Sequence, residues 1–135
     1  MTKESRCRRG FLLSQFVGRR YIALETFKRD GEGVRTPVWF VEQGGKLYVW
    51  TIGESGKVKR IRNNPRVRVN PSSVRGKPKG NWIEAKASLI GPEASALFTD
   101  LIRRKYGFQF WIVNHLHAGI RRRVVVEIEP ANSPR

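Results

Sequence analysis

Hydrophobic and polar residues alternate along much of the chain, and a period of two residues is typical of β-strands. Six segments of this kind are bounded by turn or loop residues, at positions 21–27, 34–41, 46–51, 66–70, 81–90 and 123–129. The early connections are turns too short to hold a crossover helix, so the pattern predicts an antiparallel sheet rather than a parallel one.

Two later segments change to the period of a helix. Residues 55–62 place Val58 and Ile61 on one helical face. Residues 92–106 have the spacing of one buried stripe, with a proline in the first turn and a glycine just beyond the end. The stripe consists of Ala94, Leu97, Phe98, Leu101 and Ile102. We therefore expect one short and one longer helix inserted between strands.

The length fits a single domain over residues 1–135, with a frayed basic terminus at 1–9 and a short helix near 11–16. Six antiparallel strands with two inserted helices are typical of a small closed or split β-barrel. Residues 108–119 are dense in apolar residues and ambiguous in period, with a helix as one interpretation. The fold class is therefore mainly β with short flanking helices.

Charge adds a functional constraint. The chain has 27 Lys and Arg against 11 Asp and Glu, which gives a formal net charge of +16 and an isoelectric point near 11.2. Such a protein attracts anions, which include nucleic acid, acidic membranes and small molecules that carry phosphates or carboxylates. The distribution of the charges has to distinguish these classes.

Cysteine usage points to a reducing compartment, because Cys7 is the only cysteine and no intrachain disulfide can form. Residues 7–13 resemble a twin-arginine export signal, but polar and basic residues soon interrupt the apolar run, so we expect a cytoplasmic protein. No segment has the roughly 20 apolar residues that a membrane span needs. His115 and His117 have no metal-ligand spacing, so no metal site is expected.

The start of the 55–62 helix has the parts of an anion site. Ser55 can cap the helix, Gly56 removes side-chain bulk, and Lys57 and Arg60 share a helical face. Free backbone N–H groups and two cations at a helix start suit a phosphate. The alternative is that these basic residues are only a solvated helix face.

The neighbouring strands could add a place for a flat ring. Proline cannot donate a hydrogen bond to a sheet, so Pro37 in the middle of strand 34–41 predicts a free edge. Trp50 and Thr51 end the strand that precedes the anion-site turn. A planar ligand could lie along the strand edge, with its phosphorylated tail at the turn. The alternative is that Trp39 and Trp50 are ordinary core aromatics.

The sequences TPVWF at 36–40, LYVWT at 47–51 and SGKVKRIRNNPRV at 55–67 occur in this order and spacing. Together they resemble the pyridoxamine 5′-phosphate oxidase-like split-barrel family, and especially its deazaflavin-dependent branch. With the strand at 82–90 and the helix that follows it, the resemblance extends over most of the chain.

The resemblance implies a homodimeric split β-barrel with a cofactor, coenzyme F420 or the flavin FMN, at the subunit interface. It implies an oxidoreductase that transfers hydride between the cofactor and a small organic substrate. The cofactor-binding residues implied by position are Pro37, Val38, Trp39, Trp50, Thr51, Ser55, Gly56, Lys57 and Arg60. FMN-binding members usually carry basic residues around the strand segment that is apolar here at 37–40. This departure favours the deazaflavin, whose acidic oligoglutamate tail also suits a basic protein.

Two other functions remain open. Basic clusters could bind nucleic acid without catalysis, although no aromatic residues are interleaved with them in an RNA-reading pattern. These clusters contain Arg6, Arg8, Arg9, Arg19, Arg20, the loop at 75–79 and the arginines at 121–123. The second is a split-barrel protein that sequesters a flavin, haem or deazaflavin without turnover.

Overall fold

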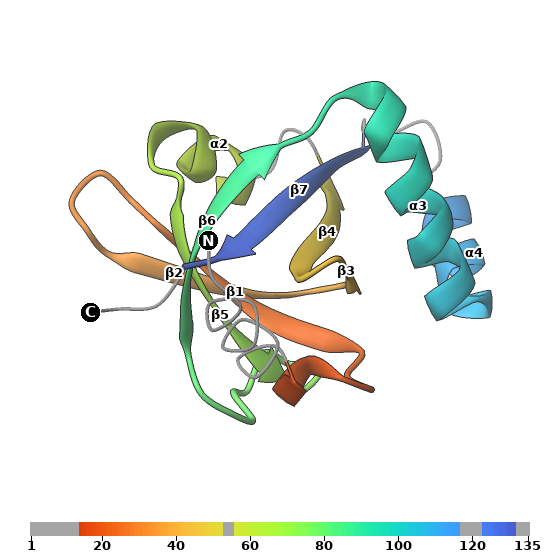
Figure 1. Cartoon of the computed structure of the whole chain (residues 1–135), viewed down its shortest axis with the longest axis horizontal. Coiled ribbons are helices and arrows are strands. Elements are labelled where there is room, and N and C mark those ends of the chain that lie inside the picture. The colour runs from red at the N-terminus through yellow and green to blue at the C-terminus, as the bar shows by residue number, and fades with distance from the viewer. Residues whose placement is uncertain (1–13, 53–55, 117–122, 132–135) are drawn as a thin grey trace.

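The computed structural model describes residues 14–52, 56–116 and 123–131 (Figure 1). The helices are the 3₁₀ helix η1 (Ser14–Phe16), α2 (Gly56–Asn63), α3 (Pro92–Tyr106) and α4 (Phe108–Leu116). The strands are β1 (Tyr21–Phe27), β2 (Gly33–Val38), β3 (Phe40–Gln43), β4 (Lys46–Ile52), β5 (Arg66–Ser72), β6 (Ile83–Leu89) and β7 (Arg123–Pro130). None of the helices in these ranges has the length and apolar composition that crossing a membrane requires.

All the strands belong to one antiparallel sheet in the order β2-β1-β5-β6-β7-β4-β3. The sheet has seven strands, so the expectation of six was wrong. The predicted strand at 34–41 is divided at Trp39, where β2 ends its pairing with β1 and β3 begins its pairing with β4. The alternation of side chains is compatible with one continuous strand, and only the change of partner reveals two.

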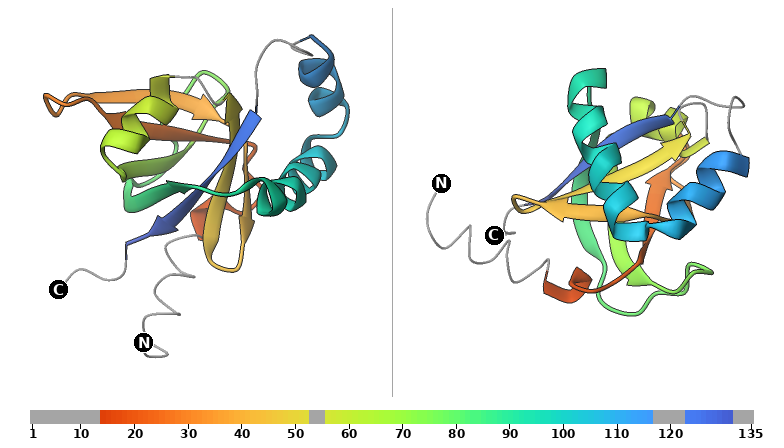
Figure 2. Two further views of the ribbon diagram at one scale, coloured as in Figure 1. Left: turned by 90° about the horizontal axis from the view of Figure 1, so that it is seen from above. Right: turned by 90° about the vertical axis from the view of Figure 1, so that its right-hand side faces the viewer.

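The two edges of the sheet, β2 and β3, are separated along the chain by Trp39 alone. The sheet must therefore curl until its edges converge at this residue, which produces the half-barrel seen in Figure 2. Pro37 lies on edge strand β2, whose only strand partner among the described residues is β1. This placement agrees with the edge that the proline predicts.

Alternation along the strands produces two hydrophobic cores. In β4, Leu47 and Val49 point into the barrel, whereas Tyr48 and Trp50 point outward. The outward residues pack against α3, which lies over the outer face of β3, β4 and β7, and against Phe110 of the adjoining α4 (Figures 1 and 2). The second core therefore lies next to the convergence of the sheet edges.

Helix α3 buries only part of the predicted stripe, because Phe98, Leu101 and Ile102 pack on the outer core while two other members do not. Phe98, Ile102 and Tyr106 are buried against the sheet, at successive four-residue intervals. Ala94 and Leu97 belong to the predicted buried stripe but are exposed, and Leu97 is 58% accessible. The helix turns its aromatic side chains inward because they stack on the sheet, as Phe98 does on Tyr48 with ring centroids 3.7 Å apart.

Candidate functional site

A hollow of about 390 Å³ lies where the sheet edges converge. It brings together six of the predicted cofactor-binding residues, namely Pro37, Val38, Trp39, Trp50, Thr51 and Lys57. They come from the end of β2, the end of β4 and the first turn of α2. A volume of this order is within the range of small-molecule sites.

Stacked aromatic rings form a wall of the hollow. The ring of Trp39 lies 4.3 Å from that of Tyr106 and 6.0 Å from that of Trp50, with both pairs nearly parallel. Trp50 is only 7% exposed, and both tryptophans belong to or pack against the outer core. They are therefore core aromatics that also line the hollow, so the two interpretations of these residues are compatible.

Lys57 supplies the positive charge of this hollow. Its Nζ lies 3.4 Å from the hydroxyl oxygen of Thr51, to which it donates a hydrogen bond. Burial lowers the pKa of Lys57, and the nearby Arg60 guanidinium lowers it further. In the described part of the chain no carboxylate lies within ion-pair distance of Lys57. The ammonium group is therefore in a setting where an anionic ligand would stabilise its charge.

Arg60 does not join Lys57 in this hollow. Its Nε donates to the hydroxyl of buried Thr26 at 2.6 Å, and the residue lines a separate basic hollow of about 450 Å³ with Lys59 and Arg29. Gly56 lies under this arginine, since a Cβ added at Gly56 would come within 2.9 Å of the guanidinium. The two cations expected to grip one phosphate thus lie in neighbouring hollows.

Several sequence predictions fall outside the described residues. Ser55, the predicted helix cap, is among them, as are Cys7, His117 and the terminus at 1–9. The basic clusters before residue 14 and at 121–122 lie outside as well. Among the residues that the structure does describe, no group of three or more His, Cys, Asp or Glu could hold a metal ion.

The sequence did not reveal four further residues that line the hollow, one of which is Val74 in the loop between β5 and β6. Tyr21 begins β1, and Gln109 and Val113 are one turn apart on α4. The Gln109 amide nitrogen donates to the Tyr21 hydroxyl at 3.5 Å, and its carbonyl oxygen accepts from Arg20. No helical period was evident at 108–119, so sequence reasoning could not place Gln109 and Val113 together.

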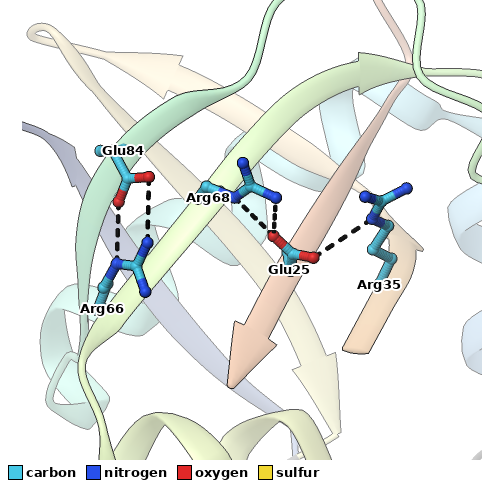
Figure 3. A network of polar contacts seen from close by, with 5 residues as sticks. All are labelled: Glu25, Arg35, Arg66, Arg68 and Glu84. Atoms are coloured by element: carbon cyan, nitrogen blue, oxygen red, sulfur yellow. Dashed lines mark hydrogen bonds and ion pairs between the residues drawn. The ribbon is translucent and has the colours of Figure 1, made fainter. Parts of the chain in front are cut away.

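Other cations of the chain have anionic partners. Glu25 is only 5% exposed, and its carboxylate accepts from Arg68 Nε at 2.6 Å and from Arg35 Nε at 3.3 Å (Figure 3). Arg66 forms a two-point ion pair with Glu84, at 3.1 and 3.3 Å. Much of the charge on this part of the sheet is thus compensated within the protein, whereas no described carboxylate pairs with Lys57.

Comparison with known proteins reveals the fold rather than a close relative. No protein-family model matches the sequence, and no curated protein matches it significantly. Solved structures do resemble it. A Listeria innocua protein provisionally described as a pyridoxamine 5′-phosphate oxidase superposes with a TM-score of 0.65 at 19% identity, over 91% of this chain and 93% of that one.

The fold is a split β-barrel. Two further structures of this type are HutZ, a haem storage protein from Vibrio cholerae, and a protein from Bacteroides thetaiotaomicron named for 5-nitroimidazole antibiotic resistance. HutZ has a TM-score of 0.63 at 16% identity and coverage of 86% of this chain and 84% of its own. The Bacteroides protein has a TM-score of 0.60 at 13% identity, with 96% and 81% covered.

The names of these neighbours include an oxidase, a storage protein and a resistance protein, so the split barrel supports more than one function. The predicted split-barrel fold is confirmed at this level. The site of this chain has to be interpreted from its own residues.

Proposed function

We propose that this protein binds a flavin-type redox cofactor in the hollow at the sheet convergence and transfers hydride between it and a small organic substrate. The proposal rests on three features that occur together in this hollow. The same hollow is lined by Pro37 on a strand edge that no described strand covers, by a wall of stacked aromatic rings, and by Lys57, which no carboxylate of the described residues neutralises.

The residues fit such a group in chemical terms. The wall at Trp39 suits a planar ring, and the main chain of β2 offers hydrogen-bonding groups along an edge that no described strand covers. Lys57 would hold the phosphate of the tail, with Thr51 beside it. When bound, the cofactor supplies the hydride chemistry, while the protein supplies position, electrostatics and exclusion of water.

Coenzyme F420 is the cofactor that we favour, with FMN as the alternative. Lys59 and Arg60, on the same helix as Lys57, line the basic hollow together with Arg29 from the β1–β2 turn, and such cations suit an acidic oligoglutamate tail. FMN has no such tail. The apolar run at 37–40 points in the same direction, because it lacks the basic residues that usually accompany FMN in similar proteins.

We also propose that the working form is a homodimer. Phe108 and Trp111 on α4 are 72% and 59% exposed, and their rings stack with centroids 5.7 Å apart. Gln109 and Val113, on the same helix, line the hollow. A second copy that packs on these aromatics would cover apolar surface and border the hollow.

Titration of the purified protein tests the cofactor assignment. Coenzyme F420 and FMN are added separately, with ligand fluorescence as the measurement, and haemin and duplex DNA over a salt series serve as further arms. We expect saturable binding of F420 and weaker binding of FMN. Tight binding of DNA or haemin with neither redox cofactor bound would refute the proposal.

Paired variants distinguish the two cofactors. Lys59→Ala should weaken F420 binding but leave FMN binding unchanged, because only F420 has a tail that reaches the basic hollow. Lys86→Ala on β6 is the matched control, since this exposed lysine lines none of the hollows described above. Equal effects of Lys59→Ala on both ligands would argue against the tail assignment.

A further inference from the structure

A second hollow, of about 520 Å³, shares no lining residue with the proposed cofactor site. It lies between the end of η1, the β3–β4 hairpin and α3. Most of its lining is apolar, with Phe16, Val41 and Leu101 contributed by the three elements in turn. Val17 at the same hollow is 81% exposed, so apolar surface here is open to water.

Lys105 is the cation of this hollow. Its Nζ donates to the main-chain oxygen of Phe40 at 2.8 Å and lies 3.6 Å from the centre of the Phe40 ring. These contacts occupy one N–H and one face of the ammonium group, which leaves other N–H groups to donate. The side chain is partly buried, so its position is fixed by the fold rather than by solvent.

Within the described ranges, no acidic side chain neutralises the charge of Lys105. Burial, together with the neighbouring guanidinium of Arg20, lowers the pKa of Lys105 to about 8. In the described ranges no carboxylate lies within ion-pair distance of Lys105. Glu42 lines the same hollow, but its carboxylate accepts a hydrogen bond from the Gly45 N–H at 3.0 Å in the hairpin turn. A lining cation with no acidic partner among the described residues favours an anionic occupant.

We propose that this hollow binds an amphipathic monocarboxylate, with its apolar body against Phe16, Val41 and Leu101 and its carboxylate on Lys105. A single cation in a largely apolar lining matches a single negative charge on an apolar molecule. A phosphate ester would bring a second negative charge that no other lining residue neutralises. The site is independent of the redox cofactor and would hold a second ligand.

Calorimetric titration with octanoate tests this site, and octanamide is the uncharged match of the same length. Octanoate should bind the unmodified protein at least tenfold more tightly than octanamide. 3-Phenylpropanoate, as a third ligand, distinguishes a preference for straight chains from one for aromatic acids, and binding of either acid supports the proposal. Failure of both acids to bind at millimolar concentration would overturn it.

Variants locate the binding. Lys105→Met keeps the length and apolar packing of the side chain, so it should remove the tenfold preference for octanoate over octanamide. Lys105→Arg keeps the charge and should retain most of that preference, which guards against a variant that merely folds poorly. Lys86→Met is the matched control and should behave as the unmodified protein does. Equal octanoate affinity of Lys105→Met and the unmodified protein would contradict the assignment.

One further variant separates this proposal from the cofactor site. Lys57→Ala should leave octanoate affinity unchanged, because Lys57 lies in the other hollow. If Lys57→Ala abolishes octanoate binding, the acid occupies the cofactor site and the proposal for Lys105 is wrong. Loss of cofactor binding alone, with octanoate binding intact, would bear only on the cofactor assignment.

Discussion

Lys57 and Lys105 are both partly buried lysines that line a hollow, but the residues around them differ. Burial lowers the pKa of both, a neighbouring arginine adds to each effect, and no carboxylate of the described residues pairs with either. Lys57 donates to a side-chain hydroxyl at 3.4 Å, whereas Lys105 donates to a main-chain carbonyl at 2.8 Å. Lys57 lies beside an aromatic wall with Thr51 and Gln109 in the same lining, whereas the lining around Lys105 is mostly aliphatic and aromatic, with Glu42 and Gln43 at the hairpin.

The contrast with the arginines of the sheet shows why these two lysines are informative. Arg35 and Arg68 surround the buried carboxylate of Glu25, so their charges are compensated inside the protein. A partly buried cation without such a partner costs stability, and a bound anion can offset that cost. Uncompensated charge in a hollow is therefore a better indicator of a ligand than positive charge as such.

The largest loss of stability is expected from removing the Glu25 carboxylate, which compensates Arg35 and Arg68. Glu25→Gln should lower the free energy of unfolding by roughly 2 to 3 kcal/mol, because it leaves two arginines side by side around a neutral amide. Urea denaturation measures this difference. Glu84→Gln is the matched control, since its pair with Arg66 is exposed and should contribute under about 1 kcal/mol. Similar losses of unfolding free energy in Glu25→Gln and Glu84→Gln would contradict the expected difference between a buried and an exposed carboxylate.

A smaller loss of stability is expected from a change at Tyr106, which contacts Trp39 of one hollow and Phe40 of the other. Tyr106 stacks on Trp39, while its hydroxyl accepts from the Phe40 N–H at 3.1 Å and donates to the Arg20 carbonyl. Tyr106→Phe keeps the stacking but leaves buried polar groups without this partner, so we expect a loss of about 1 to 2 kcal/mol in urea denaturation. Cofactor affinity should be nearly unchanged, and a strong loss of affinity would mean that the hydroxyl helps to shape the cofactor hollow.

The pH dependence of stability separates the lysines further. The folded pKa of Lys105 is about 8 and its ordinary value is 10.5, so the unfolded chain binds more protons between these values. The free energy of unfolding should therefore rise from pH 8 to pH 9.5 relative to Lys105→Met. The other charged neighbours of Lys105 are Arg20 and Glu42, and burial raises the pKa of the adjacent Tyr106 to about 12, above this pH range. If the free energy of unfolding changed with pH in the same way for the unmodified protein and Lys105→Met, Lys105 would be solvated in the folded state.

Much of the fold could be predicted from the sequence because strand alternation and turn residues are local signals. The division at Trp39 could not, since side chains alternate through 34–41 whichever strand each half pairs with. The exposed side of α3 was also unpredictable, because Leu97 fits the helical stripe and only packing against the sheet selects which apolar residues are covered.

For the site, local motifs identified the residues around Pro37, Trp50 and Lys57 that line one hollow. Helical spacing predicted that Lys57 and Arg60 would act together, but it says nothing of Thr26, a distant buried hydroxyl to which Arg60 donates. The hollow at Lys105 had no sequence signal. Its lining comes from three separate elements, and a lysine in the last turn of a helix is ordinary.

The most direct test of the central claim is the dissociation constant of the redox cofactor for Lys57→Met and Lys105→Met, measured side by side by ligand fluorescence. Lys57→Met should weaken binding of coenzyme F420, or of FMN if that is the cofactor, by about tenfold or more, because a charge-assisted hydrogen bond contributes roughly 1.5 to 3 kcal/mol. Lys105→Met should leave it unchanged. Equal dissociation constants for the unmodified protein and Lys57→Met would contradict the account.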